Sequence, residues 1–559
     1  MPITVAVTGH RDIPKEDELL LSAALREQLD RIAIDQPHSP RLLLSGLAEG
    51  ADRLAARCAL NAGWLLGAVL PLPQAEYEMD FNSGESIAEF RELLKQAAFV
   101  QVVNRPHEQV RPVCYSGLGR WLSRYALLLV AFWSGEANRL EGGAAETVRE
   151  FLEGVPRDDV SLPETGPVIQ ITTRRLCDLD APIEVGKVIL HAPRPAGLPS
   201  EGEIERWALV LRRIDDFNRN AKDVLQTMPE AVANAKTWLF DKDTFDEAGC
   251  PAAARNAIWL HAVADRISFK TQTRRDRHLL AILMLSLLAI VFQQVYGGPL
   301  PQPVLLLAAV ACGGLAYGVF RHGLSQRLEE RYLDYRALAE ACRTQFYWKV
   351  AGIDDCAADH FLREQRDELE WIRQAVLMSE LGATLSATPS ADQIKNIRKW
   401  WIEDQRSWLL DVKNNSKGKA DDNERLSNKW ETLAKIFVIS GLVTMLALVP
   451  FHLWVAPKFG ERGNLIAAVV TAAYGLMFAL GGLCKVYQEI KAFPEQANRY
   501  RRLGLTMTLA RNRLDTLLVE GNLVQARNIL RDVGKTALAE NSDWLLIHRA
   551  RPPSVPLGR

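Results

Sequence analysis

Three glycine-bearing segments, each between an apolar run and a helix-like pattern, could hold an anionic ligand. They are Gly9-His10-Arg11, Gly46 to Asp52, and Gly142-Gly143. Glycine allows the backbone to approach a ligand closely, and the free N–H groups at the start of a helix, together with its dipole, favour an anion. We therefore predict one phosphate-binding site that these three segments share.

Several polar side chains near these segments are candidate ligands for the same group. Arg120 and Arg124, one helical turn apart, either make charge-assisted contacts with phosphate or are solvated surface arginines. His10 is a candidate base or phosphate donor, although a structural role at a strand end also fits. Glu49 and Asp52 either bind ribose hydroxyls or cap the helix that follows, and we favour capping for Asp52. The predicted ligand-binding set is Gly9, His10, Arg11, Gly46, Glu49, Gly50, Asp52, Arg120, Arg124, Gly142, Gly143 and Glu146.

Five short apolar runs predict the strands that position these residues. The runs are residues 3–8, 41–45, 65–70, 99–103 and 126–132, with helical patterns between most of them. Short buried strands that alternate with helices are typical of a parallel sheet covered on both faces. We predict a doubly wound α/β domain, in which ligands bind at the carboxyl ends of the strands.

Charge, cysteines and length exclude several classes of protein. The formal net charge is −1, from 67 Lys and Arg against 68 Asp and Glu, which excludes a histone-like or polybasic protein.

Eight scattered cysteines include no CxxC pair and no His-Cys cluster at zinc spacing, so we predict no metal site. The first residues, MPITVAVTGHRD, lack the regions of a signal peptide, and we expect the first domain to stay in the cytoplasm. A chain of 559 residues predicts at least two folding units.

Four apolar stretches predict transmembrane helices in two hairpins. They are residues 279–296, 303–320, 436–455 and 465–483, and none contains Asp, Glu, Lys or Arg. A helix of about 18 residues is roughly 27 Å long, which matches a bilayer core of about 30 Å, although a buried core hairpin is the alternative. Basic residues flank the first hairpin, and none lies in its turn, so we predict that both termini are cytoplasmic. These basic residues are Arg274, Arg275, Arg277, Arg321 and Arg327.

The predicted spans also indicate what they do. Their interiors hold no ionisable residue of the kind that transporters and pumps require, so secondary transport is disfavoured. Gly314 and Gly318 are four residues apart, as are Gly475 and Ala479, and such faces let helices pack closely. This packing occurs either within one chain or between chains of a homo-oligomer that forms a pore or a membrane-disrupting array.

The motifs of the first domain resemble the SLOG superfamily. They are TGHRD at 8–12, SGLAEGAD at 45–52, and the run from Tyr115 through WSG at 133–135 to EGGAAETV at 141–148. This Rossmann-like group includes LOG phosphoribohydrolases, DprA-type DNA-processing proteins and nucleotide sensors of bacterial defence. The membrane region is similar to SLATT domains, which are two-helix membrane effectors, and the hairpin occurs twice. Similar segments, 335–339 (YRALA) and 500–504 (YRRLG), follow the two hairpins and favour a duplication.

The resemblance implies a sensor, because the segment that corresponds to the catalytic turn of LOG hydrolases lacks some of its residues. LOG hydrolases use a PGGxGT turn followed by Glu, whereas EGGAAET here matches at Gly142, Gly143 and Glu146 and lacks the proline, the third glycine and the threonine. One alternative is a membrane-tethered nucleotide N-glycosidase or phosphoribohydrolase-like enzyme that uses Glu146 with Arg120 or Arg124. Another is a DprA-like single-stranded DNA binder, which we disfavour because no basic stripe with interleaved aromatics is present.

We predict a membrane effector of a bacterial antiphage system. The domains expected are 1–200 (SLOG-like sensor), 201–275 (helical connector), 276–355 (first hairpin with a long cytoplasmic helix), 356–430 (connector and polar linker) and 431–559 (second hairpin with C-terminal helices). By the resemblance, the sensor binds a nucleotide-derived second messenger, such as a cyclic ADP-ribose-like molecule or a cyclic nucleotide, made by an upstream enzyme. The partners expected are this ligand, the lipid bilayer of the inner membrane and further copies of the chain, without nucleic acid or cofactor.

Overall fold

The computed structural model contains two compact units whose segments interleave along the chain. The sheet unit comprises Met1–Trp238, Lys242–Ala264 and Ala337–Thr388, and the helical unit comprises Leu239–Asp241, Asp265–Arg336 and Pro389–Arg559. The structure describes residues 1–550 apart from 104–109, 137–141, 156–163, 178, 180–182, 196–200, 244, 246, 248, 362–368, 384–388 and 412–417. Each unit is described by itself.

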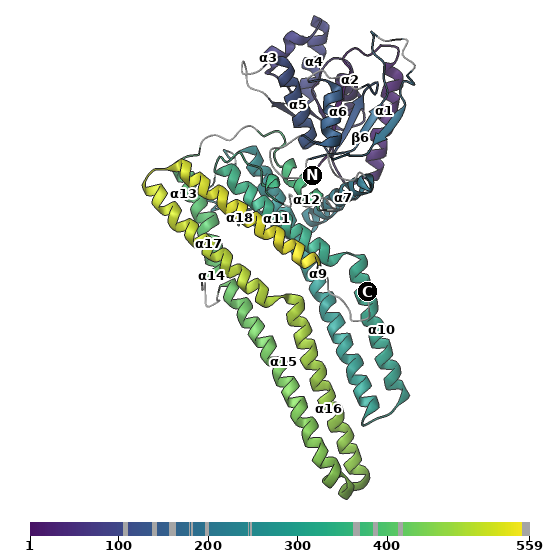
Figure 1. Cartoon of the computed structure of the whole chain (residues 1–559), viewed down its shortest axis with the longest axis vertical. Coiled ribbons are helices and arrows are strands. Elements are labelled where there is room, and N and C mark those ends of the chain that lie inside the picture. Colours follow the sequence, from purple (N-terminus) through teal and green to yellow (C-terminus); the bar gives the residue numbers. More distant parts are fainter. Residues whose placement is uncertain are drawn as a thin grey trace. The chain divides into compact units, whose positions relative to one another are not determined.

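A seven-stranded sheet with the order β4-β3-β2-β1-β5-β6-β7 forms the centre of the sheet unit (Figure 1). The strands are β1 (Ile3–Gly9), β2 (Arg41–Ser45), β3 (Leu65–Leu70), β4 (Phe99–Val102), β5 (Leu128–Phe132), β6 (Val168–Ile171) and β7 (Val188–His191). Strands β1 to β6 are parallel, and β7 pairs with β6 in the antiparallel direction. The five predicted strands are confirmed, whereas β6 and β7 were not predicted, and the antiparallel β7 makes the sheet mostly rather than wholly parallel.

Helices cover the sheet, and its central strands are therefore buried on both faces. The connections are α1 (Glu18–Asp35), α2 (Ala51–Asn61), α3 (Gln74–Tyr77), α4 (Gly84–Gln96), α5 (Arg111–Tyr125) and α6 (Ala144–Glu153). Helix α2 packs against α1 and α4, and α5 packs against α6. Since crossovers between parallel strands are right-handed, reversal of the strand order at β1 puts these two groups on opposite faces. The predicted doubly wound arrangement therefore applies to strands β1 to β6.

Helix α7 (Glu203–Thr227) is bonded to the amino-terminal edge of the sheet. Helices α8 (Pro229–Lys236) and α12 (Glu370–Met378) pack against α7. On α7, the Asp215 carboxylate accepts hydrogen bonds from the His38 backbone N–H (2.9 Å) and the Ser39 hydroxyl (2.8 Å). Asn218 Nδ2 donates to the carbonyl oxygen of Met1 (2.8 Å). The predicted connector after residue 200 therefore packs directly against the sheet domain.

The helical unit contains long helices, and two of them, α9 and α11, also extend into the sheet unit. Its elements are α9 (Ala252–Gly297), α10 (Pro303–Ser325), α11 (Leu328–Val350), α13 (Ala391–Ile397), α14 (Asp404–Leu410), α15 (Lys419–Pro450), α16 (Ala456–Lys491), α17 (Phe493–Val519) and α18 (Leu523–Ala550). Three helical stretches are long and apolar enough to cross a membrane: Ala252–Gly297, Pro303–Val350 and Lys419–Val519. The four predicted apolar segments thus lie in three such stretches rather than in four separate ones.

The third stretch doubles back on itself, and α15 and α16 pack together along their length (Figure 1). A Cβ on Gly441 would lie 3.3 Å from the ring of Phe478, and one on Gly481 would lie 2.8 Å from Val438. Since the residue number rises along one helix as it falls along the other, the two helices are antiparallel. The reversal includes Gly460, whose φ of 53° is in the left-handed region that favours glycine.

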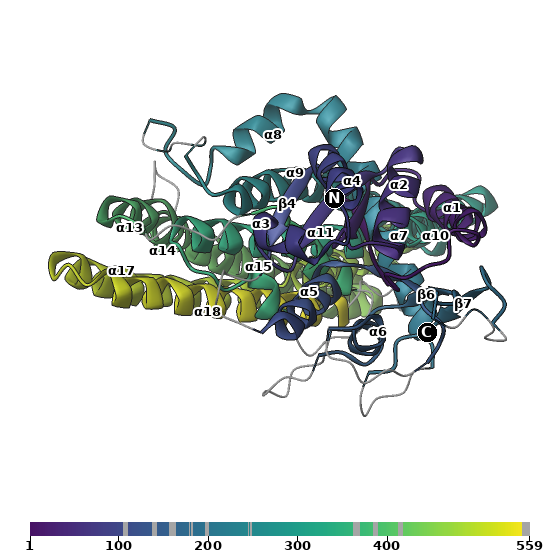
Figure 2. The same ribbon diagram turned by 90° about the horizontal axis from the view of Figure 1, so that it is seen from above.

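Helix α16 also packs against α9. A Cβ on Gly475 would lie 2.7 Å from the side chain of Gln294, and Lys491 Nζ lies 2.9 Å from an Asp276 carboxylate oxygen. Helices α17 and α18 run side by side (Figures 1 and 2). The polar linker predicted within residues 356–430 ends in a helix from Lys419 onward, and residues 412–417 lie outside the described residues.

Candidate functional site

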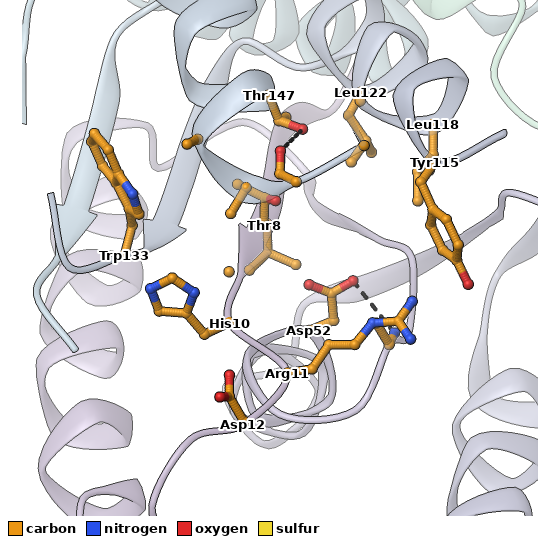
Figure 3. A pocket seen from close by; sticks show the side chains of 18 of the residues that line it. Thr8, His10, Arg11, Asp12, Asp52, Tyr115, Leu118, Leu122, Trp133 and Thr147 are labelled. Atoms are coloured by element: carbon orange, nitrogen blue, oxygen red, sulfur yellow. Dashed lines mark hydrogen bonds between the residues drawn. The ribbon is translucent and has the colours of Figure 1, made fainter. Parts of the chain in front are cut away.

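A cavity of about 300 Å³ lies at the carboxyl ends of β1 and β5, where the strand order reverses (Figure 3). Its walls come from the residues after β1, the residues after β5, the middle of α5 and the start of α6. In doubly wound sheets the two loops at such a reversal diverge to opposite faces and leave a crevice for ligands. The predicted position of the site, at the carboxyl edge of the sheet, is where this cavity lies.

The first two glycine-bearing segments are locked to each other beneath the cavity. The backbone N–H of Ala51 donates to the carbonyl oxygen of His10 (3.1 Å). A Cβ on Gly9 would lie 2.5 Å from the Ala51 Cβ, and one on Gly50, whose φ is 79°, would collide with the carbonyl oxygen of Arg11. These two glycines are therefore required by chain packing, a role distinct from the close approach to a ligand that motivated their selection.

The third segment opens the start of α6 to the cavity. Gly142 has a φ of 78°, and its backbone N–H donates to a Glu146 carboxylate oxygen at 2.6 Å. Ser116 Oγ donates to the other oxygen of Glu146 at 3.3 Å. Glu146 thus stabilises its own loop. The cavity is lined by Gly143, Ala144 and Ala145.

Arg11 supplies a guanidinium to the cavity wall (Figure 3). Its guanidinium carbon lies 4.9 Å from the centre of the Tyr115 ring, and the Tyr115 hydroxyl donates to Asp80. Burial, together with this hydrogen bond to Asp80, raises the pKa of Tyr115 to about 12. Among the described residues, Arg11 has no carboxylate oxygen within the 4.0 Å of an ion pair. The Arg11 guanidinium is therefore able to form an ion pair with an anionic ligand.

Asp52 lies in the floor of the cavity and is 8% exposed. Burial raises the pKa of its carboxyl group to about 7, although the Ala48 backbone N–H and the positive charge of Arg11 act in the opposite direction. The hydrogen bond from Ala48 N to Asp52 Oδ2 is 3.4 Å long. Asp52 therefore holds the second glycine segment, and its charge changes near neutral pH.

His10 and the ion pair beside it complete the polar wall. The Ser134 backbone N–H donates to His10 Nε2 at 3.3 Å, so the neutral ring carries its proton on Nδ1. Burial lowers the pKa of His10, and the charge of Arg175 lowers it further. Arg175 Nε lies 3.0 Å and 3.1 Å from the two carboxylate oxygens of Asp12. At neutral pH His10 is thus an uncharged donor or acceptor.

The structure brings half of the predicted site residues together. Those that line the cavity are Gly9, His10, Arg11, Asp52, Gly142 and Gly143; those that do not are Gly46, Glu49, Gly50, Arg120, Arg124 and Glu146. Glu49 accepts hydrogen bonds from Asn82 (2.8 Å) and Ser86, and Arg120 Nε lies 3.2 Å from Glu150. Arg124 Nη2 lies 2.8 Å from Asp359. Glu141, the first residue of the EGGAAETV motif, lies outside the described residues.

Sequence reasoning missed several residues of the cavity wall. Asp12 lies inside the TGHRD motif and could have been included on that ground, and Tyr115 and Trp133 were noted only as parts of motifs. Arg175 follows β6, which was not predicted, so no signal in the sequence indicated it. The missing information was the pairing of β6 with β5.

The site therefore has the parts to bind an anion beside an aromatic group: the start of a helix, an Arg11 guanidinium, a neutral His10 and the ring of Trp133. Among the described residues, no group of three or more His, Cys, Asp and Glu side chains is placed to hold a metal ion. No protein-family model matches the chain, and no curated protein is significantly similar to it.

Proposed function

We propose that the sheet unit binds a nucleotide-derived ligand between β1 and β5, and that binding changes the apolar helices so that they permeabilise or depolarise a membrane. The ligand is a second messenger, such as a cyclic ADP-ribose-like molecule or a cyclic nucleotide, made by a partner enzyme during antiphage defence. One observation carries the proposal: Arg11 and the start of α6 face the same cavity, in a chain that also contains three stretches able to cross a membrane.

The contacts of Glu146 support binding rather than catalysis. A hydrolase of the LOG type needs an acid at the ribose, whereas Glu146 accepts hydrogen bonds from Gly142 and Ser116 and does not line the cavity. His10 Nε2 already accepts a hydrogen bond from the backbone of Ser134. A single-stranded DNA binder would need a basic groove, but the cavity wall carries side chains of both signs.

For the membrane region we propose four spans, α9, α10, α15 and α16, with both termini in the cytoplasm. The antiparallel packing of α15 and α16 and the reversal near Gly460 support two spans in the third stretch. Reporter fusions after Gly298 and near Gly460 should report the periplasm, and a fusion after Arg327 should report the cytoplasm. A cytoplasmic signal at either loop would contradict the four-span topology.

Helix α5 is a candidate route from the cavity to the spans. Tyr115 and Leu118 on its amino-terminal half line the cavity. At its carboxyl end, Arg124 binds Asp359, and the Tyr125 hydroxyl donates to Glu380 at 3.0 Å. These acids follow α11, which forms the end of the second stretch after a turn at Gln326 and Arg327. A ligand that moves α5 by differential binding to two states needs about 5.5 kcal/mol to change a population from 1:99 to 99:1.

The test combines binding and leakage in one preparation of the full chain. Reconstituted liposomes loaded with a self-quenching dye are exposed to 3′,5′-cyclic AMP, 3′,5′-cyclic GMP, cyclic ADP-ribose and ADP-ribose, and binding is measured by calorimetry. Arg11→Gln should weaken binding at least tenfold and abolish leakage at the same ligand concentration. The matched control is Arg31→Gln on the exposed face of α1, which should behave as the wild type. Arg11→Gln with unchanged affinity would contradict the site, and tight binding without leakage would contradict the output.

Oligomerisation is part of the proposal, because α10 has an open small-residue face. Within the described part of the chain, nothing lies within 4 Å of a Cβ on Gly314 or Gly318, whereas Gly475 is covered by Gln294. We expect Gly314→Leu with Gly318→Leu to abolish leakage while ligand affinity stays unchanged, since close approach between helices of different copies would be blocked. A doubly substituted protein with full leakage would contradict this role.

A further inference from the structure

The charged side chains of the cavity wall nearly balance one another. Two guanidinium groups, of Arg11 and Arg175, face three carboxyl groups, of Asp12, Asp52 and Glu136. A site for a polyphosphate chain is expected to present an excess of cations, because each added phosphate brings further negative charge. The wall of this cavity has no such excess.

Pairing within the wall reduces the positive charge further. Arg175 is held by both carboxylate oxygens of Asp12, at 3.0 Å and 3.1 Å, and the charge of Glu136 also acts on it. Among the described residues, Arg11 is the guanidinium of this cavity without a carboxylate partner. The cavity thus offers one side-chain cation to an incoming anion.

The start of α6 offers the second favourable contribution. Helix α6 has ten residues, and its N-cap residue, Gly143, makes no side-chain cap, so its first backbone N–H groups remain available where they line the cavity. A helix start is equivalent to about half an elementary positive charge. Thr147, whose hydroxyl donates to the Gly143 carbonyl oxygen (3.4 Å), lies in the same wall (Figure 3). About 1.5 positive charges match one phosphate group, which carries about −1 as a diester and −1.5 to −2 as a monoester.

We propose that the cavity selects ligands that carry one phosphate group, as a nucleoside monophosphate or a cyclic nucleotide does. Glu136 repels a second phosphate, and Asp12 withholds the Arg175 guanidinium from it. This inference rests on the proposed function of the site, and of the two messenger classes named there it selects the cyclic nucleotides over the cyclic ADP-ribose-like molecules, which carry two phosphates. Rejection by like charge is a common way to obtain specificity when the attractive contacts are shared by the competing ligands. The ring of Trp133, which donates its indole N–H to the Glu136 carbonyl oxygen at 2.9 Å, is available beside the phosphate for a base.

The experiment measures the affinity of the full chain in detergent for adenosine and guanosine 5′-mono-, di- and triphosphates and for 3′,5′-cyclic AMP and cyclic GMP, with EDTA. A second series contains Mg²⁺. We expect the compounds with one phosphate to bind at least tenfold more tightly than the di- and triphosphates in EDTA. Equal or tighter binding of the di- or triphosphates would overturn the inference while leaving the proposed nucleotide site intact. If no nucleotide binds, the proposed function itself fails.

Variants of the acidic wall test the cause of the selectivity. Glu136→Gln and, separately, Asp12→Asn should each raise the affinity for ADP relative to AMP by about tenfold, since the first variant removes a repulsive charge and the second releases Arg175. The matched control is Asp30→Asn on the exposed face of α1, which should leave the ratio unchanged. Glu136 has an exposed side chain, so this variant keeps the test valid if loss of the Asp12 ion pair impairs folding. An unchanged ADP to AMP ratio in both wall variants would overturn the role of the acids.

Discussion

The ion pair between Arg124 and Asp359 provides the sharpest test of the structure, because the sequence suggested a different role for Arg124. As a phosphate ligand, Arg124 would be needed for binding; in the structure it lies outside the cavity and joins α5 to a residue 235 positions away. Its two terminal nitrogens donate to the two carboxylate oxygens at 3.0 Å and 2.8 Å. Glu164 lies 3.9 Å from the same guanidinium. We therefore expect Arg124→Met to change stability rather than affinity.

The expected magnitude follows from the geometry and the burial of the pair. Both side chains are 26% exposed, between the exposed pairs that contribute about 0.2–1 kcal/mol and the buried pairs whose disruption costs about 3–5 kcal/mol. A bidentate pair of this burial should contribute about 2 kcal/mol. For the sheet unit, at about 2.1 cal/mol/K of unfolding entropy per residue, such a loss lowers the Tm by roughly 3 °C.

The assay is thermal unfolding of the full chain in detergent, for wild type, Arg124→Met, Asp359→Asn and the double variant. We expect the double variant to lose less stability than the sum of the single changes, with a coupling energy of about 1–2 kcal/mol. The control is Arg26→Met, whose exposed partner lies at 3.8 Å and whose loss should change the free energy of unfolding by less than about 0.5 kcal/mol. Additive effects, or loss of nucleotide binding without loss of stability, would refute the assignment of Arg124.

Three further outcomes are expected. Gly9→Ala should lower the free energy of unfolding by about 1–3 kcal/mol even without ligand, because the new Cβ would lie 2.5 Å from a neighbouring Cβ; an unchanged Tm would contradict this packing. Burial raises the pKa of Asp52 from 3.8 to about 7, so the native state keeps a proton that the unfolded chain releases, and stability should fall between about pH 4 and pH 7. Asp52→Asn should remove this decline, and parallel Tm profiles against pH would show that the group is not buried. Gly475→Leu should lower the Tm of the solubilised protein because the Gln294 side chain fills that position, whereas Gly314→Leu should leave it unchanged.

Much of the fold could be predicted because its signals are local. Five apolar runs of five to seven residues are sufficient to indicate strands β1 to β5, of which the edge strand β4 is only partly buried. β6 and β7, of four residues each, were missed, although β4 has the same length and was predicted. The apolar segments were recognised from composition, but their grouping into three helical stretches depends on helical continuity through Phe451–Val455, which hydropathy does not report.

In the candidate site, too, the sequence predicts the position of the loops but not the contacts of their side chains. The loops at the ligand edge could be predicted from the sequence, because the carboxyl ends of parallel strands share one edge, and so could the helix start at Gly142-Gly143. Which side chains are available there depends on contacts between distant segments. Arg11 stays without a carboxylate partner, Arg175 is neutralised by Asp12, and Arg124 is held by Asp359. A charged side chain pairs with an opposite charge that packs within a few ångströms, and the partners of Arg124 and Arg175 come from segments that the neighbouring sequence does not specify.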